Sequence, residues 1–341
     1  MTCNKAKSFV LNNHSEKLKR IEGGLKDHPF PPQLVIETTS RCNMMCIHCS
    51  HKEMRRPRAD MEESVFRRIV DEVAQEMPEC EIWPTFYGEA LLLGDTIWRW
   101  LDYAAAVGCR NIVLNSNGIL LGRMIDQVLA SPLKRFIVSL DGFQTETFKK
   151  IRVGGSRDKI FHAVEELLRQ REARGQKFPV IQCQFSLMKE NEGEVQEFTD
   201  YWRARGAEVK IRRMLSWSST GSIVVPDLSN DVPIRIACPW GNNAAAIHQN
   251  GDLVACAVDY EGRFVAGNVK EHSIEAIWHG RHKIALRDLH RRHEWDKIPE
   301  ICQGCPDWQV VGAQYIGEEG ESEGSRPFWH GKSSPVINLI H

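Results

Sequence analysis

Three cysteines stand close together near the start of the chain, Cys42, Cys46 and Cys49, in the spacing CxxxCxxC. A [4Fe–4S] cluster normally binds four cysteine thiolates, so three would leave one iron open to a small molecule. The spacing also fits a helical stripe of buried thiols, or part of a zinc site. However, Thr38-Thr39-Ser40 before the motif indicates a loop, and zinc prefers four ligands. We therefore favour an iron–sulfur cluster with an open iron.

A second set of cysteines lies in the last third of the chain. Cys238 and Cys256 flank a predicted β-hairpin, and Cys302 and Cys305 form a CxxC pair after a predicted helix. Four thiolates complete the ligand set of a zinc ion or of a [4Fe–4S] cluster, and the spacing alone does not choose between them.

Composition excludes several classes of protein. The chain has 341 residues, enough for one large and one smaller domain. Its 44 Lys and Arg balance 45 Asp and Glu, which gives no basic field for nucleic acid. We find neither an apolar run long enough to span a membrane nor the core of a signal peptide. Eleven cysteines in such a chain indicate metal or redox chemistry rather than disulfides. We expect a cytoplasmic protein that binds neither nucleic acid nor a membrane.

The elements that must position these cysteines follow an alternating pattern from residue 34 to about 215. Strands are predicted over 34–37, 81–86, 111–115, 135–140, 179–188 and 208–213. Helices are predicted over 61–77, 95–107, 124–130, 159–172 and 193–205, and later over 274–290 after a hairpin of 244–248 and 253–257. Six strands with helical crossovers predict an α/β fold with a parallel sheet and outer helices. The pattern does not distinguish an open sheet from a barrel.

Polar residues follow the predicted strands at their C-terminal ends. Tyr87-Gly88-Glu89 follows the second strand, and Asn115-Ser116-Asn117-Gly118 follows the third. Ser139-Leu140-Asp141-Gly142 follows the fourth, with Arg152 shortly beyond. Each alone reads as turn chemistry, since Asn-Gly and Asp-Gly are common turn dipeptides. Their succession after the cysteine motif makes coincidence negligible.

Together these motifs resemble the radical S-adenosylmethionine (SAM) superfamily. The resemblance implies that Cys42, Cys46 and Cys49 bind a [4Fe–4S] cluster whose open iron is chelated by the amino and carboxylate groups of SAM. It also implies a partial (β/α)6 barrel of the TIM type, and cleavage of SAM to methionine and a 5′-deoxyadenosyl radical. The resemblance implies that SAM contacts His48 near the adenine, Gly88 and Glu89 at the amino group, and Ser139 and Arg152 at the carboxylate. It also implies a contact with Asn117, in the Asn-Gly turn after the third strand. Tyr87 and Ala90 depart from the family's usual glycine and proline.

The fifth predicted strand separates its side chains by polarity. Gln182, Gln184 and Ser186 alternate with an apolar set that includes Cys183. Because helices cover the outside of the sheet, the polar face is expected to point into the interior. Gln184 is therefore a candidate contact for SAM or substrate, and Cys183 a core residue. On the sixth strand the same alternation favours Arg212 as the arginine that reaches the pocket.

The last third resembles the SPASM/twitch extension of radical SAM enzymes, through its cysteines together with Asp259, Gly267-Asn268 and Ile277-Trp278. Full SPASM domains have seven cysteines and two auxiliary clusters. Four match here, so the resemblance implies the twitch form, with one auxiliary [4Fe–4S] cluster on Cys238, Cys256, Cys302 and Cys305. The expected organisation is an extension over 1–33, a radical SAM barrel over 34–215, a linker over 216–233, a twitch domain (hairpin plus helix) over 234–310 and a tail over 311–341. Residues 1–33 are too few for a leader-binding winged-helix domain.

Among possible reactions we favour dehydrogenation of a carbinol carbon in a sugar or aminocyclitol of the aminoglycoside type. The four-cysteine spacing resembles twitch-type dehydrogenases of antibiotic biosynthesis, in which a fully ligated cluster accepts an electron. A flavodoxin or ferredoxin is the expected reducing partner. The alternatives are epimerisation of a sugar carbon, which needs a free thiol, modification of a ribosomally made peptide, and decarboxylation or rearrangement of a nucleotide sugar. A binding module with zinc in both sites would leave the strand-end residues without a role.

The sequence does not identify the general base. Tyr87, Arg212 and Asp259 are candidates for the substrate pocket, as are His51 and Trp217, because each lies beside a cysteine set or at a strand end.

Overall fold

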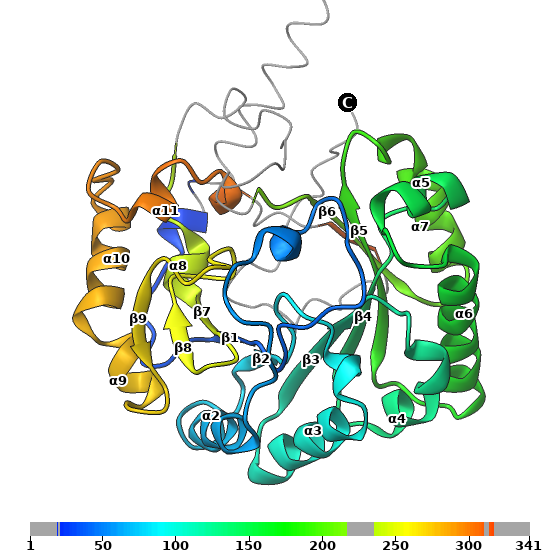
Figure 1. Cartoon of the computed structure of the whole chain (residues 1–341), viewed down its shortest axis with the longest axis horizontal. Coiled ribbons are helices and arrows are strands. Elements are labelled where there is room, and N and C mark those ends of the chain that lie inside the picture. The colour runs from blue at the N-terminus through cyan, green and yellow to red at the C-terminus, as the bar shows by residue number, and fades with distance from the viewer. Residues whose placement is uncertain (1–18, 20, 217–234, 310–313, 317–341) are drawn as a thin grey trace, which may run out of the picture.

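Six parallel strands form the centre of one sheet, which has ten strands among the described residues (Figure 1). The structure is a computed structural model that describes residues 19, 21–216, 235–309 and 314–316. The central strands are β1 (Gln33–Ile36), β2 (Glu81–Trp83), β3 (Asn111–Ser116), β4 (Arg135–Ser139), β5 (Val180–Leu187) and β6 (Glu208–Arg213). They lie side by side in chain order, each parallel to the next, which confirms the predicted parallel α/β core.

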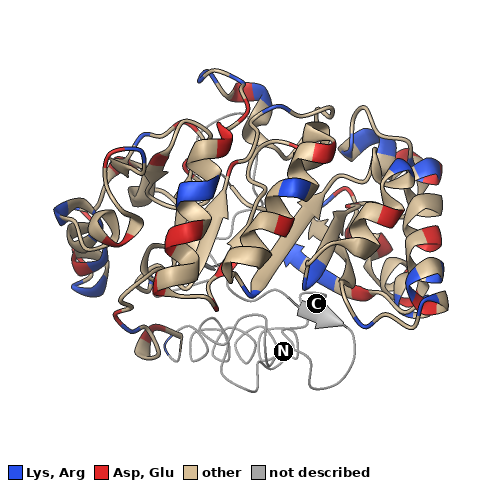
Figure 2. Ribbon diagram, turned by 90° about the horizontal axis from the view of Figure 1, so that it is seen from below, with Lys and Arg blue, Asp and Glu red and all other residues tan. Residues whose placement is uncertain are grey.

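Helices cover the outer side of this curved sheet (Figure 1). They are α2 (Glu63–Glu76), α3 (Asp95–Val107), α4 (Ile125–Ala130), α5 (Thr145–Ile151), α6 (Arg157–Ala173) and α7 (Val195–Arg203). In α2, the five buried residues recur at helical spacing and form the face toward the sheet: Val65, Phe66, Ile69, Val70 and Val73. The outer surfaces of these helices carry both acidic and basic residues (Figure 2).

The predicted alternation of β5 is confirmed. Cys183 and Phe185 lie in the apolar core outside the sheet, where the Phe185 ring packs 4.8 Å from that of Phe198 on α7. On the opposite face, the Gln182 side chain donates to Glu208 of β6 at 2.7 Å, and Glu208 pairs with Arg135 of β4 at 3.2 Å. This part of the barrel interior therefore holds a buried polar network.

The last third of the chain extends the same sheet. Its elements are α8 (Pro239–Asn243), β7 (Ala244–Ile247), β8 (Asp252–Val254), β9 (Val265–Asn268), α9 (Ile274–Trp278), α10 (Arg281–Arg291) and α11 (Glu300–Gln303). β7 pairs in parallel with β1 and antiparallel with β8, so the predicted hairpin is confirmed and the sheet runs on from the barrel without a break. Gly251 occupies its turn with φ of 95°, a conformation that favours glycine.

Two predictions about elements need correction, and one helix outside the parallel strands was not predicted. The single helix predicted over 274–290 is two helices, because Gly280 is extended and starts α10 as its N-cap. Helix α5 was not predicted, since its short polar sequence buries only Phe148 and Ile151. Residues 314–316, predicted as tail, form β10 (Gln314–Ile316), which pairs antiparallel with β6.

The predicted linker, apart from Ser216, lies outside the described residues, as do most of the N-terminal extension and the tail. The five-part division of the chain therefore stays a prediction. Within the described ranges, no helix has the length and apolar character needed to cross a bilayer.

A buried ion pair joins the end of β1 to the last third of the chain. The Arg56 guanidinium donates to both oxygens of the Glu37 carboxylate, which is fully buried. The same guanidinium donates to the backbone oxygen of Tyr260 at 2.6 Å and to the side chain of Gln249 at 2.7 Å. Burial raises the pKa of Glu37 and the contacts with Arg56 oppose that rise, so the carboxylate depends on this arginine for its charge.

We predict that Arg56→Met lowers the free energy of unfolding by about 3–5 kcal/mol, because it leaves Glu37 buried without its cation. Adding Glu37→Gln should restore part of the loss. Urea unfolding of the reconstituted chain measures both. The matched control is Arg110→Met, which breaks the exposed pair with Glu79 and should cost less than about 1 kcal/mol. Equal losses from Arg56→Met and Arg110→Met would contradict the prediction.

Candidate functional site

The loop after β1 brings its three cysteines together. Its backbone is held by α5 and the turn after it, since Met45 N–H donates to Val153 O at 2.9 Å and Ile47 N–H to Ile151 O at 3.0 Å. Burial, together with the charges of Cys46 and Cys42, raises the pKa of Cys49 to about 12. Three thiols are thus gathered where their thiolates would repel one another. Binding to cationic iron would stabilise them as thiolates.

Gly88 and Glu89 lie directly against this loop. A Cβ on Gly88 would stand 2.0 Å from the backbone oxygen of Thr39, so only glycine fits here. The Glu89 N–H donates to Arg41 O at 2.8 Å, which fixes the strand-two turn on the cysteine loop. The Glu89 carboxylate accepts from Ser116 Oγ at 2.9 Å and from the Asn117 N–H at 2.7 Å. Burial raises its pKa, and these hydrogen bonds oppose the rise.

Three other predicted SAM contacts line the same strand ends. Asn117 Nδ2 donates to Asn43 Oδ1, within the cysteine loop, at 2.7 Å. Ser139 Oγ donates to Asn115 Oδ1 at 3.1 Å and accepts from Gln184 Nε2 at 3.2 Å. The structure thus brings the ends of β3, β4 and β5 together with the cysteine loop, as the sequence predicts.

Asp141 anchors the remaining two predicted contacts. Its carboxylate lies 3.1 Å from Arg152 Nη1 and 3.4 Å from His48 Nε2, and accepts from the Ser186 N–H at 2.7 Å. Burial raises the pKa of Asp141, but His48, Arg152 and Ser186 outweigh that effect and hold the pKa well below its ordinary value. We did not predict this anchoring role from the sequence, although Asp141 stands in the strand-four motif.

The electrostatics of this edge fit an amino acid. Arg152 is buried, and its Nε and Nη2 find no hydrogen-bond partner among the described residues. Glu89, in the loop after β2, places a buried carboxylate at the same edge, where burial would otherwise disfavour the charge. A buried cation with two donors to spare suits a carboxylate ligand, and a buried anion suits an ammonium. SAM carries both groups on one carbon.

The second cysteine set is equally compact. Cys238 caps α8, Cys256 follows β8, Cys302 lies in α11 and Cys305 follows it. Burial raises the pKa of Cys256 well above its ordinary value, and the charges of Cys302, Cys238 and Cys305 add to the rise. Arg235 ties the α11 turn in place by donating to the backbone oxygens of Cys302 and Gln303. Four partly buried thiols here could hold a cluster without any open iron.

In the described part of the chain, no three His, Cys, Asp or Glu side chains converge as ligands of a single metal ion. Cluster ligation is a different demand, because each thiolate binds its own iron.

Tyr87 lies between the two cysteine sets. Its hydroxyl donates to Ala257 O, next to Cys256, at 3.1 Å, and its ring packs on Tyr260. Burial raises its pKa well above the ordinary value, and the charges of Cys256 and Cys49 add to this. In this structure the phenol is a hydrogen-bond donor.

Two other candidates for the substrate pocket, Asp259 and His51, are held by hydrogen bonds to the backbone. Asp259 is fully buried, and its carboxylate accepts from the Arg263 N–H at 2.8 Å and the Phe264 N–H at 3.0 Å, the geometry of a turn cap. His51 is buried and bonds Ser40 O at 2.9 Å, so it supports the loop. Both arrangements are structural and give no support to a role as base. Trp217 lies outside the described residues.

Strand β6 contributes two cations to the interior. Arg212 pairs in register with Ser186 of β5, on the polar interior face, and is partly buried. Lys210 pairs with Gln184 and is buried, with its ammonium 5.5 Å from the centre of the Trp83 ring. We did not predict Lys210 from the sequence; its position two residues before Arg212 was the available signal.

Comparison with known proteins agrees with this geometry. A model of the radical SAM superfamily matches residues 36–181, and a model of SPASM, an iron–sulfur cluster-binding domain, matches residues 238–306. The chain carries a radical SAM domain followed by a SPASM domain. These domains imply SAM, a radical SAM [4Fe–4S] cluster and auxiliary cluster binding.

Curated relatives cover different parts of the chain. The GTP 3′,8-cyclase of Peptoclostridium acidaminophilum is 30% identical over 135 residues, which are 39% of this chain and 41% of that protein. The chain thus spans about two fifths of the length of these cyclases. The mycofactocin maturase MftC of Mycolicibacterium smegmatis is 24% identical over 303 residues, 76% of this chain and 72% of that protein.

Two solved structures share the fold. BtrN in complex with AdoMet and 2-DOIA is 17% identical with a TM-score of 0.56, covering 82% of this chain and 94% of that one. SuiB from Streptococcus suis, bound to the precursor peptide SuiA, is 14% identical with a TM-score of 0.64, covering 88% and 74%. The radical SAM barrel followed by a SPASM domain is thereby established as the fold.

We predict that Ser139→Ala and Arg152→Ala each weaken SAM binding roughly 10- to 150-fold. Each removes a hydrogen bond to a charged group, worth about 1.5–3 kcal/mol. Equilibrium dialysis of the anaerobically reconstituted chain measures the affinity. The control is Arg157→Ala, whose guanidinium bonds Phe143 O at 2.7 Å and stacks on Phe161, away from these groups. Unchanged affinity in both test variants would show that the strand-four residues do not contact SAM.

Proposed function

We propose that this chain is a radical SAM dehydrogenase that oxidises a carbinol carbon to a ketone and passes an electron to an auxiliary [4Fe–4S] cluster. The observation that carries the proposal is the closed second set of four thiols, Cys238, Cys256, Cys302 and Cys305, beside the open set of three. An electron acceptor needs no free iron for substrate. In this proposal Cys42, Cys46 and Cys49 hold the cluster that binds SAM.

The remaining described cysteines support oxidation over epimerisation. Epimerisation needs a thiol that returns a hydrogen atom inside the pocket. Cys80 donates to Pro31 O at 3.1 Å and Cys109 to Val70 O at 3.4 Å, and both lie with Cys183 in the apolar core. Among the described residues, no thiol outside the two sets faces the polar interior. Cys3 lies outside the described residues.

In the proposed reaction, SAM and its cluster supply the 5′-deoxyadenosyl radical, and the second cluster takes up an electron. The abstracted hydrogen atom would leave in 5′-deoxyadenosine and the hydroxyl proton would leave to a base. Cys238, Cys256, Cys302 and Cys305 would hold the cluster that accepts the remaining electron. Arg152, Ser139 and Glu89 orient SAM, and Tyr87 donates a hydrogen bond between the two cysteine sets. Arg212 is the interior side chain proposed to contact substrate.

For substrate we propose a sugar or aminocyclitol of the aminoglycoside type, with a flavodoxin or ferredoxin as reductant. The likeness in fold to BtrN with bound 2-DOIA supports a small molecule in this architecture. A second candidate function is peptide modification. It is favoured by the match to the maturase MftC over most of both chains, and by the fold shared with SuiB bound to a precursor peptide.

We predict about eight irons per reconstituted chain, from two [4Fe–4S] clusters. Replacing Cys42, Cys46 and Cys49 together by Ala should leave about four irons and abolish SAM cleavage. Replacing Cys183 by Ala is the control and should cost only some stability, through a small core cavity. Iron analysis and anaerobic absorption spectra measure the outcome. About four irons in the intact chain would remove the electron acceptor and refute the proposal.

We predict that turnover of an aminocyclitol in deuterated buffer gives one 5′-deoxyadenosine per product. The product should be lighter by two hydrogen atoms and contain no deuterium at carbon, since both hydrogens leave and none returns. Mass spectrometry of reactions with a panel of aminocyclitols and aminoglycoside precursors measures this. A parallel panel of peptides tests the second candidate function.

Two results would refute dehydrogenation. A product that gains one deuterium indicates an epimerase, in which an exchangeable thiol returns the hydrogen. An absolute requirement for Cys80, Cys109 or Cys183 would point the same way. A modified peptide, with no aminocyclitol turned over, would establish the second candidate in place of the first.

A further inference from the structure

A lysine is buried behind the second cysteine set. Lys283 lies on α10 with none of its surface exposed. Its ammonium donates to the backbone oxygen of Ala255, the residue before Cys256, at 3.0 Å. It also lies 5.1 Å from the centre of the Trp278 ring. Two contacts therefore hold the ammonium in one place, beside the cysteines.

The charge of Lys283 is coupled to these cysteines. Burial lowers its pKa to about 8, while the thiolate charges of Cys256, Cys302 and Cys238 act in the opposite direction. The charge of Arg287, on the same helix, also lowers it. In turn, the charges of Arg235 and Lys283 oppose the rise in the pKa of Cys302. The hydrogen bond to Ala255 O places this charge next to Cys256.

A fully buried ammonium normally requires an anion beside it. Transfer of an unpaired cation from water into the protein interior is strongly unfavourable. Yet the hydrogen bond that Lys283 makes among the described residues goes to a neutral carbonyl. A cube of iron and sulfide with four thiolate ligands carries net negative charge, and would supply the missing partner.

We propose that Lys283 raises the reduction potential of the auxiliary cluster and so makes it the electron acceptor of the reaction. This inference rests on the proposed function, in which the four cysteines hold that cluster. Reduction adds one negative charge to the cluster. A fixed positive charge in a medium of low dielectric constant stabilises the reduced state more than the oxidised one. Lys283 acts through the cluster and has no contact with substrate.

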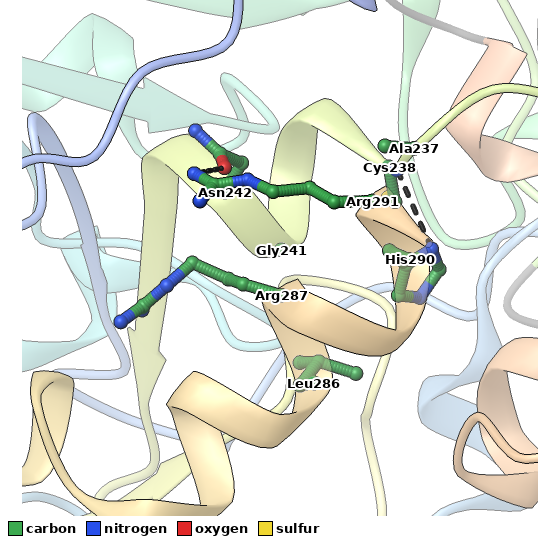
Figure 3. A pocket seen from close by; sticks show the side chains of 8 residues that line it. All are labelled: Ala237, Cys238, Gly241, Asn242, Leu286, Arg287, His290 and Arg291. Atoms are coloured by element: carbon green, nitrogen blue, oxygen red, sulfur yellow. Dashed lines mark hydrogen bonds between the residues drawn. The ribbon is translucent and has the colours of Figure 1, made fainter. Parts of the chain in front are cut away.

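Arg287 provides a matched control on the same helix. It is buried, lies 4.4 Å from the Trp278 ring and donates to Trp278 O at 2.9 Å. The charges that act on it are Asp27, Arg291 and Asp288 rather than thiols. Arg287 and Cys238 both line the space between α8 and α10. Figure 3 shows the Arg287 side chain extending away from Cys238. Arg287→Met therefore removes a buried cation from the same helix, but not one whose pKa is affected by the cysteines.

The experiment uses the full-length chain with Cys42, Cys46 and Cys49 replaced by Ala, so that one cluster gives the signal. Its reduction potential is measured by redox titration monitored by electron paramagnetic resonance, in the parent and in Lys283→Met, Lys283→Arg and Arg287→Met. We expect Lys283→Met to lower the potential by at least 59 mV, a tenfold change in the one-electron equilibrium. Lys283→Arg and Arg287→Met should stay close to the parent.

An unchanged potential in Lys283→Met, or an equal fall in Arg287→Met, overturns the inference. If Lys283→Met fails to retain iron, the arginine variant decides. Retention in Lys283→Arg supports a requirement for the positive charge, and loss in both shows that side-chain shape matters instead, which overturns the inference. A parent without any cluster refutes the proposed function itself. A parent with a cluster insensitive to Lys283 refutes only this inference.

Discussion

Seven buried or partly buried thiols in two sets are the constraint on which the rest of this structure depends. Burial raises the pKa of these thiols, and in each set neighbouring thiolates raise it further. Such sets are unfavourable as free thiolates and become favourable on binding a cationic iron cluster. The backbone that holds them must therefore be fixed by other contacts. Those contacts are the pairing of the first loop with the α5 turn, the glycine contact at Gly88, and the Arg235 bonds to α11.

The two sets differ in what surrounds them. The three-cysteine loop faces polar strand ends. Beside it, Arg152 has two buried N–H donors without partners in the described part of the chain. The four-cysteine set is backed by Lys283 and the packed α10 helix instead. Ligand chemistry is thus expected at the first set and electron storage at the second. Tyr87 lies between them, bonded to the residue after Cys256.

Much of this site could be predicted from the sequence, because its residues lie in short motifs near strand ends. Strand ends in a parallel sheet meet at one edge, so Glu89, Asn117 and Ser139 follow from strand order once the sheet is known. Arg152 lies farther along, at the end of α5. The alternation in β5 correctly separated Cys183 from Gln184. The family resemblance added the roles of the cysteines, which spacing alone left open between zinc and iron–sulfur.

The features that were missed depend on tertiary structure. Lys210 and Lys283 look like surface lysines in the sequence, and only the folded chain shows that they are buried. Asp259 was placed near the pocket by its proximity to Cys256, but its carboxylate is used to close a turn. Helix α5 has too few apolar residues for its period to be seen, and β10 pairs with a strand about one hundred residues away. Sequence patterns report local order better than distant partners.

The central claim is that one cluster is open to SAM and the other is closed. Mössbauer spectra of the chain reconstituted with 57Fe, recorded with and without SAM, test it directly. We predict about eight irons in two cubane clusters, of which about one changes its coordination when SAM binds. A response to SAM from irons of both clusters, or from none, would contradict the claim.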